Sequence, residues 1–221
     1  MPSNKLSLPD GVELTVGPDD LSDPSLLESV LTPAALELVA GLHREFEGRR
    51  RQLMADRDER SASLEAGGTL DFLAETKSVR EDDSWKVSPP APGIEDRRAE
   101  ITGPTDAKMA INALNSGAKV WLADFEDANT PLFENMLAGQ ANLQASLDGS
   151  LSFKNPDGKE YSLGDDLATI VVRPRGWHLP EKHVRVDGQP VSGGLFDFAL
   201  YLVHCGQAQI DRGQGPYYYI P

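Results

Sequence analysis

Residues 119–125 read Lys-Val-Trp-Leu-Ala-Asp-Phe, a nearly continuous apolar run with an acidic residue near its carboxyl end. Such a run is typical of a β-strand that is covered on both faces, as the strands of a parallel sheet are. A second run of this kind spans residues 168–173 (Ala-Thr-Ile-Val-Val-Arg), and a third spans residues 216–221 (Pro-Tyr-Tyr-Tyr-Ile-Pro). Helical patterns lie between these runs, and this alternation predicts a parallel sheet and therefore an α/β fold.

The segments between the three strands carry helix and turn signals. Thr105 or Asp106 is expected to cap a helix that Gly117 ends, because a capping oxygen precedes its apolar face and a glycine follows it. The other signals predict helices at 131–145 and 195–208 and small β-hairpins at 150–163 and 184–190. Three parallel strands do not easily close a barrel or form a covered open sheet, so we expect the chain to be incomplete.

The first 95 residues read instead as helices joined by polar linkers. Thr32 offers a capping hydroxyl and Pro33 suits the first helical position, so a helix is expected to begin here and to continue to about residue 58. Its apolar face, at helical spacing, consists of Leu38, Val39, Leu42 and Phe46. The apolar patch at 70–73 (Leu-Asp-Phe-Leu) is suited to docking on something larger, and the proline-rich stretch 88–93 predicts a linker.

The composition disfavours several classes of partner. The 221 residues carry a formal net charge of −14 at pH 7, which argues against nucleic acid and against anionic membrane surfaces. No stretch approaches the ~20 apolar residues that a membrane helix needs. The single cysteine, Cys205, permits no internal disulfide, and the polar residues 1–5 are followed by no apolar run of a secretory signal. We therefore expect a soluble, cytoplasmic protein.

Three carboxylates follow the first apolar run, at Asp124, Glu126 and Asp127. The carboxyl ends of parallel strands form the active-site face of a barrel. Strand alternation points Asp124 and Glu126 to the same side and Asp127 to the other. Carboxylates aimed at one point need a cation between them, and Mg²⁺ suits oxygen ligands. The alternative, that Asp127 caps the next helix and Glu126 is merely solvated, carries about equal weight.

Arg173 follows the second apolar run in the same way and opens the sequence Arg-Pro-Arg-Gly-Trp-His-Leu. A guanidinium keeps its charge and offers a planar fork of donors, which suits a carboxylate or a developing oxyanion. The alternative is a structural arginine that pairs with the acids of the first strand. His178 in this loop is a possible base but more often a structural residue. The remaining histidines give no sign of a site: His43 is expected to be solvated, and His183 and His204 lack the spacing of metal ligands. Cys205 is expected to be a buried apolar side chain and not a nucleophile.

Six blocks follow one another from about residue 95 onward. They are residues 97–104 (Arg-Arg-Ala-Glu-Ile-Thr-Gly-Pro), 111–120 (Ile-Asn-Ala-Leu-Asn-Ser-Gly-Ala-Lys-Val), 123–127 (Ala-Asp-Phe-Glu-Asp), 173–183 (Arg-Pro-Arg-Gly-Trp-His-Leu-Pro-Glu-Lys-His), 194–198 (Gly-Leu-Phe-Asp-Phe) and 215–219 (Gly-Pro-Tyr-Tyr-Tyr). In this order and spacing they resemble malate synthase of the short bacterial and glyoxysomal type. Together the blocks are highly specific, whereas each alone is weak.

The resemblance implies a fold, a domain organisation and a reaction. A helical N-terminal domain and linker (residues 1–95) precede the first strands of an incomplete TIM (β/α)8 barrel with small hairpin insertions (residues 96–221). The implied reaction condenses glyoxylate with acetyl-CoA and water, giving malate and CoA in the glyoxylate cycle. Mg²⁺ is the implied cofactor. Arg173 corresponds to the family's catalytic arginine, and Asp124, Glu126 and Asp127 border the metal, mainly through its waters.

The direct metal ligands and the aspartate base of the family are expected downstream of Pro221. The resemblance therefore implies that these 221 residues alone are inactive, and that the protein is cytoplasmic, or peroxisomal or glyoxysomal in a eukaryote. Two alternatives stay open. One is an acyl-CoA lyase of the citrate-lyase β type, which shares the barrel and an acidic strand end but not the Arg-Pro-Arg-Gly-Trp-His-Leu block. The other is a non-catalytic truncated module.

Overall fold

A four-stranded parallel sheet carries the strand ends that the sequence singles out. The computed structural model describes residues 7–221, so residues 1–5, used above to exclude a secretory signal, lie outside the described part. The sheet has the order β2-β3-β6-β9, and each neighbouring pair is parallel. Its strands are β2 (Glu100–Gly103), β3 (Val120–Asp124), β6 (Thr169–Arg173) and β9 (Tyr217–Tyr218).

The parallel sheet and the α/β class are confirmed, with one strand more than the three predicted. No apolar run marks β2 in the sequence, because its residues are only partly buried and alternate with exposed ones. By contrast, Trp121, Ala123 and Val172 in the two central strands are fully buried. β9 is also shorter than predicted, since only Tyr217 and Tyr218 pair with β6.

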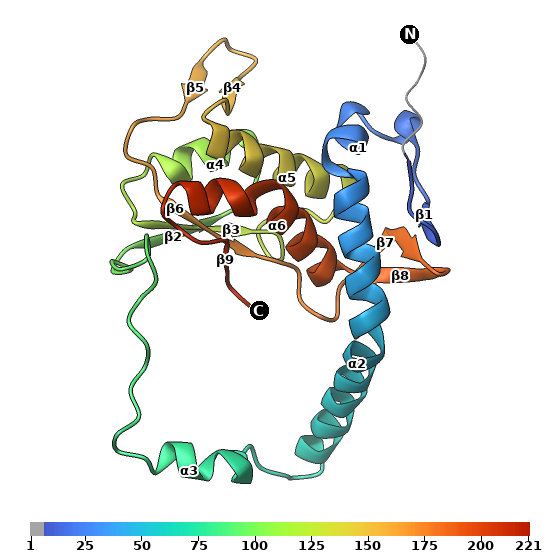
Figure 1. Ribbon diagram of the computed structural model, residues 1–221, viewed down its shortest axis with the longest axis vertical. Coiled ribbons are helices and arrows are strands. Elements are labelled where there is room, and N and C mark those ends of the chain that lie inside the picture. Colours follow the sequence, from blue (N-terminus) through green and yellow to red (C-terminus); the bar gives the residue numbers. More distant parts are fainter. Residues whose placement is uncertain (1–6) are drawn as a thin grey trace.

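Three helices lie together over one face of this sheet (Figure 1), namely α4 (Ala107–Leu114), α5 (Phe133–Asp148) and α6 (Gly193–Asp211). Asp106 caps α4, where its side chain accepts a hydrogen bond from the Met109 amide at 3.1 Å. Ser192 caps α6 in the same manner. The apolar sides of these helices and the sheet enclose a core around Trp121, Phe125 and Tyr201.

Two antiparallel additions flank the main sheet, as the hairpin signals predicted. The first is β4 (Ser152–Lys154) with β5 (Glu160–Ser162), and the second is β7 (Pro180–Val186) with β8 (Gln189–Ser192). β1 (Val12–Leu14) joins the second pair to give the order β1-β7-β8. This strand contradicts the helices and linkers expected before residue 95. Its hydrogen-bonding partners, Val184 to Val186, are distant in sequence, so no local pattern indicates it.

The N-terminal helices are α1 (Ser25–Val30) and α2 (Pro33–Glu65), followed by the short α3 (Lys77–Arg80). Thr32 caps α2 as predicted, although the helix continues to Glu65 instead of about residue 58. The second half of α2 and the segment with α3 project away from the sheet (Figure 1). The apolar patch at 70–73 lies on this projection, and Phe72 is 83% exposed in the described part of the chain.

The buried face of α2 differs from the predicted one. Phe46 is 42% exposed, whereas His43, expected to be solvated, is only 5% exposed. α2 packs against α6 and β8, and the side of the helix that makes this contact is not the side that carries Phe46. The residues on that face, at the spacing of one helix side, are Ala35, Leu36, Val39, Ala40, His43 and Glu47.

One hydrophobic core joins segments from both sides of residue 95. Leu36 and Val39 of α2 belong to the same buried cluster as Leu137 of α5 and Phe196 of α6. The stretch 88–93 has neither helix nor strand, in agreement with a linker. The domain boundary at residue 95 stays a prediction. Among the helices described, none is long and apolar enough to cross a lipid bilayer.

His43 should make stability depend on pH. Burial lowers its pKa below the ordinary 6.5, while the charges of Glu47 and Asp187 oppose this more weakly. The unfolded chain therefore binds the His43 proton more readily, so the free energy of unfolding should fall as the pH drops below about 6.5. Urea unfolding at about pH 5.5 and about pH 7.5 measures the difference. His43→Gln should reduce it, and an unchanged difference would contradict this origin.

Candidate active site at the strand ends

The parallel register of β3 and β6 brings the predicted site residues together. Asp124 and Arg173 are the last residues of the two strands and are direct register partners. Arg173 Nη1 lies 3.3 Å from Asp124 Oδ2 and 2.7 Å from Asp127 Oδ2. Arg173 Nη2 lies 2.7 Å from Glu126 Oε2. One guanidinium is therefore surrounded by all three predicted acids at the carboxyl end of the sheet.

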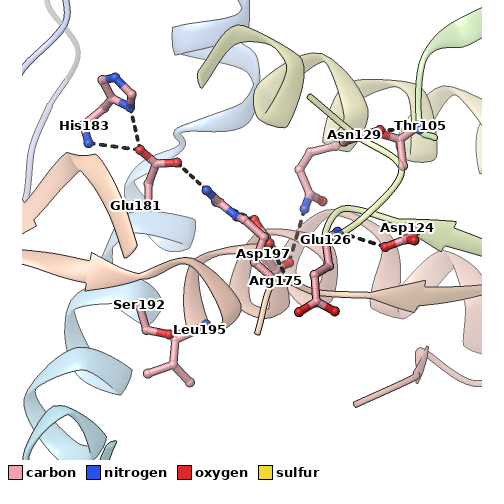
Figure 2. A network of polar contacts seen from close by, with 11 residues as sticks. Thr105, Asp124, Glu126, Asn129, Arg175, Glu181, His183, Ser192, Leu195 and Asp197 are labelled. Atoms are coloured by element: carbon pink, nitrogen blue, oxygen red, sulfur yellow. Dashed lines mark hydrogen bonds and ion pairs between the residues drawn. The ribbon is translucent and has the colours of Figure 1, made fainter. Parts of the chain in front are cut away.

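Asp124 organises the turn that carries the other two acids. Its side chain is 2% exposed, and Oδ1 accepts hydrogen bonds from the amides of Glu126 at 2.9 Å and Asp127 at 3.1 Å. Figure 2 shows the first of these bonds. The chain thus turns directly after β3, and strand alternation no longer applies. The expectation that Asp127 points away from the other acids is wrong, because the turn brings all three to Arg173.

The charge balance favours an ionised arginine. Desolvation lowers the pKa of Arg173, but the charges of Asp124, Glu126 and Asp127 outweigh this effect and raise the pKa above its ordinary value. Three carboxylates around one guanidinium leave an excess of negative charge at the rim. Tyr219 adds its ring on another side, with its centroid 5.8 Å from Arg173 Cζ.

Two buried polar atoms at this point have no hydrogen-bond partner within residues 7–221. One is Arg173 Nε, a donor, and the other is Glu126 Oε2, an acceptor. Glu126 Oε2 is close to Arg173 Nη2, but the contact is an ion pair by distance and lacks the direction of a hydrogen bond. Unpaired buried polar atoms are costly, so their presence marks a place where a further polar group is expected.

A cavity of about 600 Å³ opens beside the acids. Glu126 and Asp127 line one side of it, and His178, Lys182 and His183 line another. His178 is exposed and has no side-chain hydrogen bond among those of residues 7–221, so it is not the hydrogen-bonded structural residue that its loop position favoured.

The loop after β6 contains a buried network that the sequence did not reveal. Arg175 is paired with Asp197 and Glu181, and Glu181 Oε1 lies 2.7 Å from His183 Nδ1 (Figure 2). Asp197 lies on the apolar side of α6, beside the fully buried Phe196. A carboxylate on the apolar side of a predicted helix is the signal that points to a buried partner.

The other histidines and the cysteine have structural surroundings. His204 Nε2 lies 2.7 Å from the Val30 carbonyl oxygen and so ties α6 to α1. Cys205 is fully buried, and burial raises the pKa of its thiol to about 12, which makes it a poor nucleophile. The interpretation of Cys205 as a buried apolar side chain is confirmed.

The described residues do not make a complete metal site. No group of three or more His, Cys, Asp or Glu within residues 7–221 is placed to hold a metal ion. Asp124 uses Oδ1 for two backbone amides and Oδ2 for Arg173. Glu126 Oε2 and the 69% exposed Asp127 side chain have acceptor capacity left, which suits water molecules around a cation more than direct ligation.

Loss of the Asp124 side chain should destabilise the turn. Asp124→Ala leaves two backbone amides and part of Arg173 without an acceptor, so the free energy of unfolding should fall by about 1–3 kcal/mol. Asp127→Ala removes an exposed carboxylate and should cost less than about 0.5 kcal/mol. Chemical denaturation of both variants measures the difference. Equal losses would show that the Asp124 hydrogen bonds do not stabilise the turn.

Two family sequence models match the chain. The model described as malate synthase, N-terminal domain, matches residues 27–78. The model described as malate synthase, TIM barrel domain, matches residues 169–221. The second match includes β6, α6 and β9, so the parallel sheet belongs to a TIM barrel domain, as the sequence resemblance implied.

Curated relatives agree with both matches. The chain is 52% identical to the malate synthase of Myxococcus xanthus (strain DK1622), over 87% of this chain and 35% of the relative. It is 51% identical to the malate synthase of Streptomyces clavuligerus, over 88% and 37%. It is 48% identical to the glyoxysomal malate synthase of Candida tropicalis, over 90% and 36%. The chain thus spans little more than a third of these relatives. It belongs to the malate synthase family, and it carries sequence from both the N-terminal and the TIM barrel domains.

Proposed function

We propose that the protein containing this sequence condenses glyoxylate with acetyl-CoA and water, giving malate and CoA in the glyoxylate cycle. The observation that carries the proposal is the polar pair at the strand ends. Among residues 7–221, Arg173 Nε is a buried donor without a hydrogen-bond partner, and Glu126 Oε2 has only the ion pair with Arg173 Nη2 at 2.7 Å. A site with unused donors and acceptors at the carboxyl rim of a barrel sheet is suited to small, highly oxygenated substrates.

Arg173 is the group that this chain offers to a developing negative charge. Removal of a methyl proton from acetyl-CoA gives an enolate, whose oxygen becomes anionic. A guanidinium stabilises such an oxygen because it stays protonated and its donors are fixed in one plane. The ion pairs with Asp124 and Asp127 hold Arg173 before substrate arrives, so little reorganisation is needed during the reaction.

We propose Mg²⁺ as the cofactor and place Glu126 and Asp127 beside it. A divalent cation, when bound, supplies polarisation of a substrate carbonyl. The excess of carboxylate over guanidinium at the rim attracts a cation, and the open acceptor on Glu126 fits a hydrogen bond from a metal-bound water. The direct ligands and the base that removes the methyl proton are proposed to come from residues other than those described.

The location and the partners follow from the family and the charge. We place the protein in the cytoplasm, or in peroxisomes or glyoxysomes if its source is a eukaryote. Relatives from Candida tropicalis and Brassica napus are named glyoxysomal. The net charge of −14 supports small-molecule substrates, acetyl-CoA and glyoxylate, over nucleic acid or an anionic membrane surface.

Arg173→Lys tests the proposed role in the protein as the cell makes it. Lysine keeps the charge but loses the planar fork, so turnover should fall by about tenfold or more. The assay measures the CoA thiol released from acetyl-CoA in the presence of glyoxylate and Mg²⁺. Unchanged turnover removes Arg173 from the catalytic role. If the wild-type protein instead cleaves malyl-CoA without releasing CoA, it is an acyl-CoA lyase.

The 221 residues by themselves should release no CoA in the same assay. Residues 7–221 contain no group of three or more His, Cys, Asp or Glu placed to hold a metal ion. We propose that the base also comes from another part of the protein. A cooperative unfolding transition is the control that the chain is folded when it is assayed. Mg²⁺-dependent release of CoA by this chain would show that its own residues complete the site.

A further inference from the structure

Arg175 is turned into the protein interior, unlike Arg173 two residues earlier. Its side chain is 4% exposed. The Nε and Nη2 atoms donate to Asp197 Oδ2 at 2.9 Å and to Asp197 Oδ1 at 2.8 Å, and Nη1 donates to Glu181 Oε2 at 2.8 Å. Figure 2 shows this network between α6 and β7. All three nitrogens of the Arg175 guanidinium therefore donate to carboxylates within the protein.

The same carboxylate also holds the backbone. The Arg175 amide donates to Asp197 Oδ2 at 2.9 Å, so Asp197 binds both the main chain and the side chain of Arg175. Asp197 itself is fully buried near the start of α6. One residue, Pro174, separates this fixed amide from Arg173, the residue whose side chain reaches the acids. The position of the end of β6 is thus tied to the first turns of α6.

Glycines allow the loop to lie this close to its neighbours. A Cβ atom on Gly194 would lie 2.5 Å from the Arg175 carbonyl oxygen, and one on Gly193 would lie 2.9 Å from Arg175 Nε. On the other side of the loop, a Cβ atom on Gly176 would lie 2.6 Å from Glu126 Oε1. The loop therefore fits between the start of α6 and the turn that carries the acids. The Gly193-Gly194 pair, which has no phosphate-loop pattern, serves this close packing.

Stability alone does not explain why the side chains of Arg175, Glu181 and Asp197 are buried together. Burying an arginine with two carboxylates costs desolvation free energy, and apolar side chains of similar volume often give equal or greater stability. Burial of Glu181 raises its pKa, but the charge of Arg175 and the bonds from His183 outweigh this and lower it. The hydrogen bonds from Arg175 to Asp197 and Glu181 are directional. A directional contact fixes a position that apolar packing alone leaves free to shift.

We propose that Asp197 and Arg175 are positioning residues, which fix the carboxyl end of β6 and thereby aim the Arg173 guanidinium at the reacting oxygen. The inference rests on the proposed function, since it assigns these residues to the reaction of that same site. It assigns them no contact with substrate. Their effect passes through the backbone between residues 173 and 175 and through the fit of the loop against Gly194.

The kinetic test uses Asp197→Asn in the protein as the cell makes it. Asparagine keeps the shape but loses the charge, so the loop should shift by a fraction of an ångström. The expected result is a fall in kcat of between about tenfold and about a hundredfold, with the KM for acetyl-CoA changed less than about threefold. The control is Tyr201→Phe on the same helix, which removes the buried hydrogen bond to Gln209 at 2.7 Å. It should lower stability and leave kcat within about twofold.

Gly194→Ala is a second test of the positioning role, and this variant leaves every charged side chain in place. The added methyl group meets the Arg175 carbonyl oxygen, so the loop must move, and kcat should fall as in Asp197→Asn. This variant keeps the test decisive if Asp197→Asn does not fold. An unchanged kcat in a folded variant of either kind, or a fall no larger than in Tyr201→Phe, overturns the proposal.

Hydrogen exchange separates this inference from the proposed function, because it needs no activity. The amides of Arg173 and of residues 175–179 should exchange at least about tenfold faster in Asp197→Asn than in the wild type, with no such change in Tyr201→Phe. Exchange that does not change overturns the positioning role. If exchange is faster in Asp197→Asn but the wild-type protein releases no CoA, the loop is held as proposed and the proposed function is wrong.

Discussion

The site depends on the parallel pairing of β3 with β6, in which Asp124 and Arg173 are register partners at the strand ends. This pairing fixes the distance between an anion and a cation by backbone hydrogen bonds, before any side chain contributes. A shift of one residue would turn Arg173 to the other face of the sheet. The turn built on Asp124 then adds Glu126 and Asp127, so that three carboxylates share a single guanidinium.

Two arginines in one loop have opposite tasks. Arg173 remains 21% exposed, and its Nε has no hydrogen-bond partner among residues 7–221, whereas Nε, Nη1 and Nη2 of Arg175 all donate to Asp197 or Glu181. The difference arises from the Pro174 step between them and from the glycines at the start of α6, which admit the Arg175 side chain. A site built this way separates an arginine that faces the rim from an arginine that holds the loop. Such support is what a rigid catalytic geometry requires.

The N-terminal helix also contacts this loop. Arg50 of α2 donates to the Trp177 carbonyl oxygen at 2.6 Å, while its Nε donates to the buried Glu47 at 2.7 Å. The loop is therefore held from inside by α6 and from outside by α2. Together with the core that joins α2 to α5 and α6, this contact makes the first half of α2 part of the support of the strand ends.

The sequence by itself determined the α/β class, the two central strands, the cap of α2 and the placement of Asp124 and Arg173 at strand ends. These follow from local patterns: apolar runs, capping residues and the order of elements. Only the tertiary structure decided β1 and β2, the buried face around His43, the turn that brings Asp127 to Arg173, and the pairing of Arg175 with Asp197. Each of these depends on a partner distant in the chain, and one-dimensional periodicity carries no information about which distant residue becomes a neighbour.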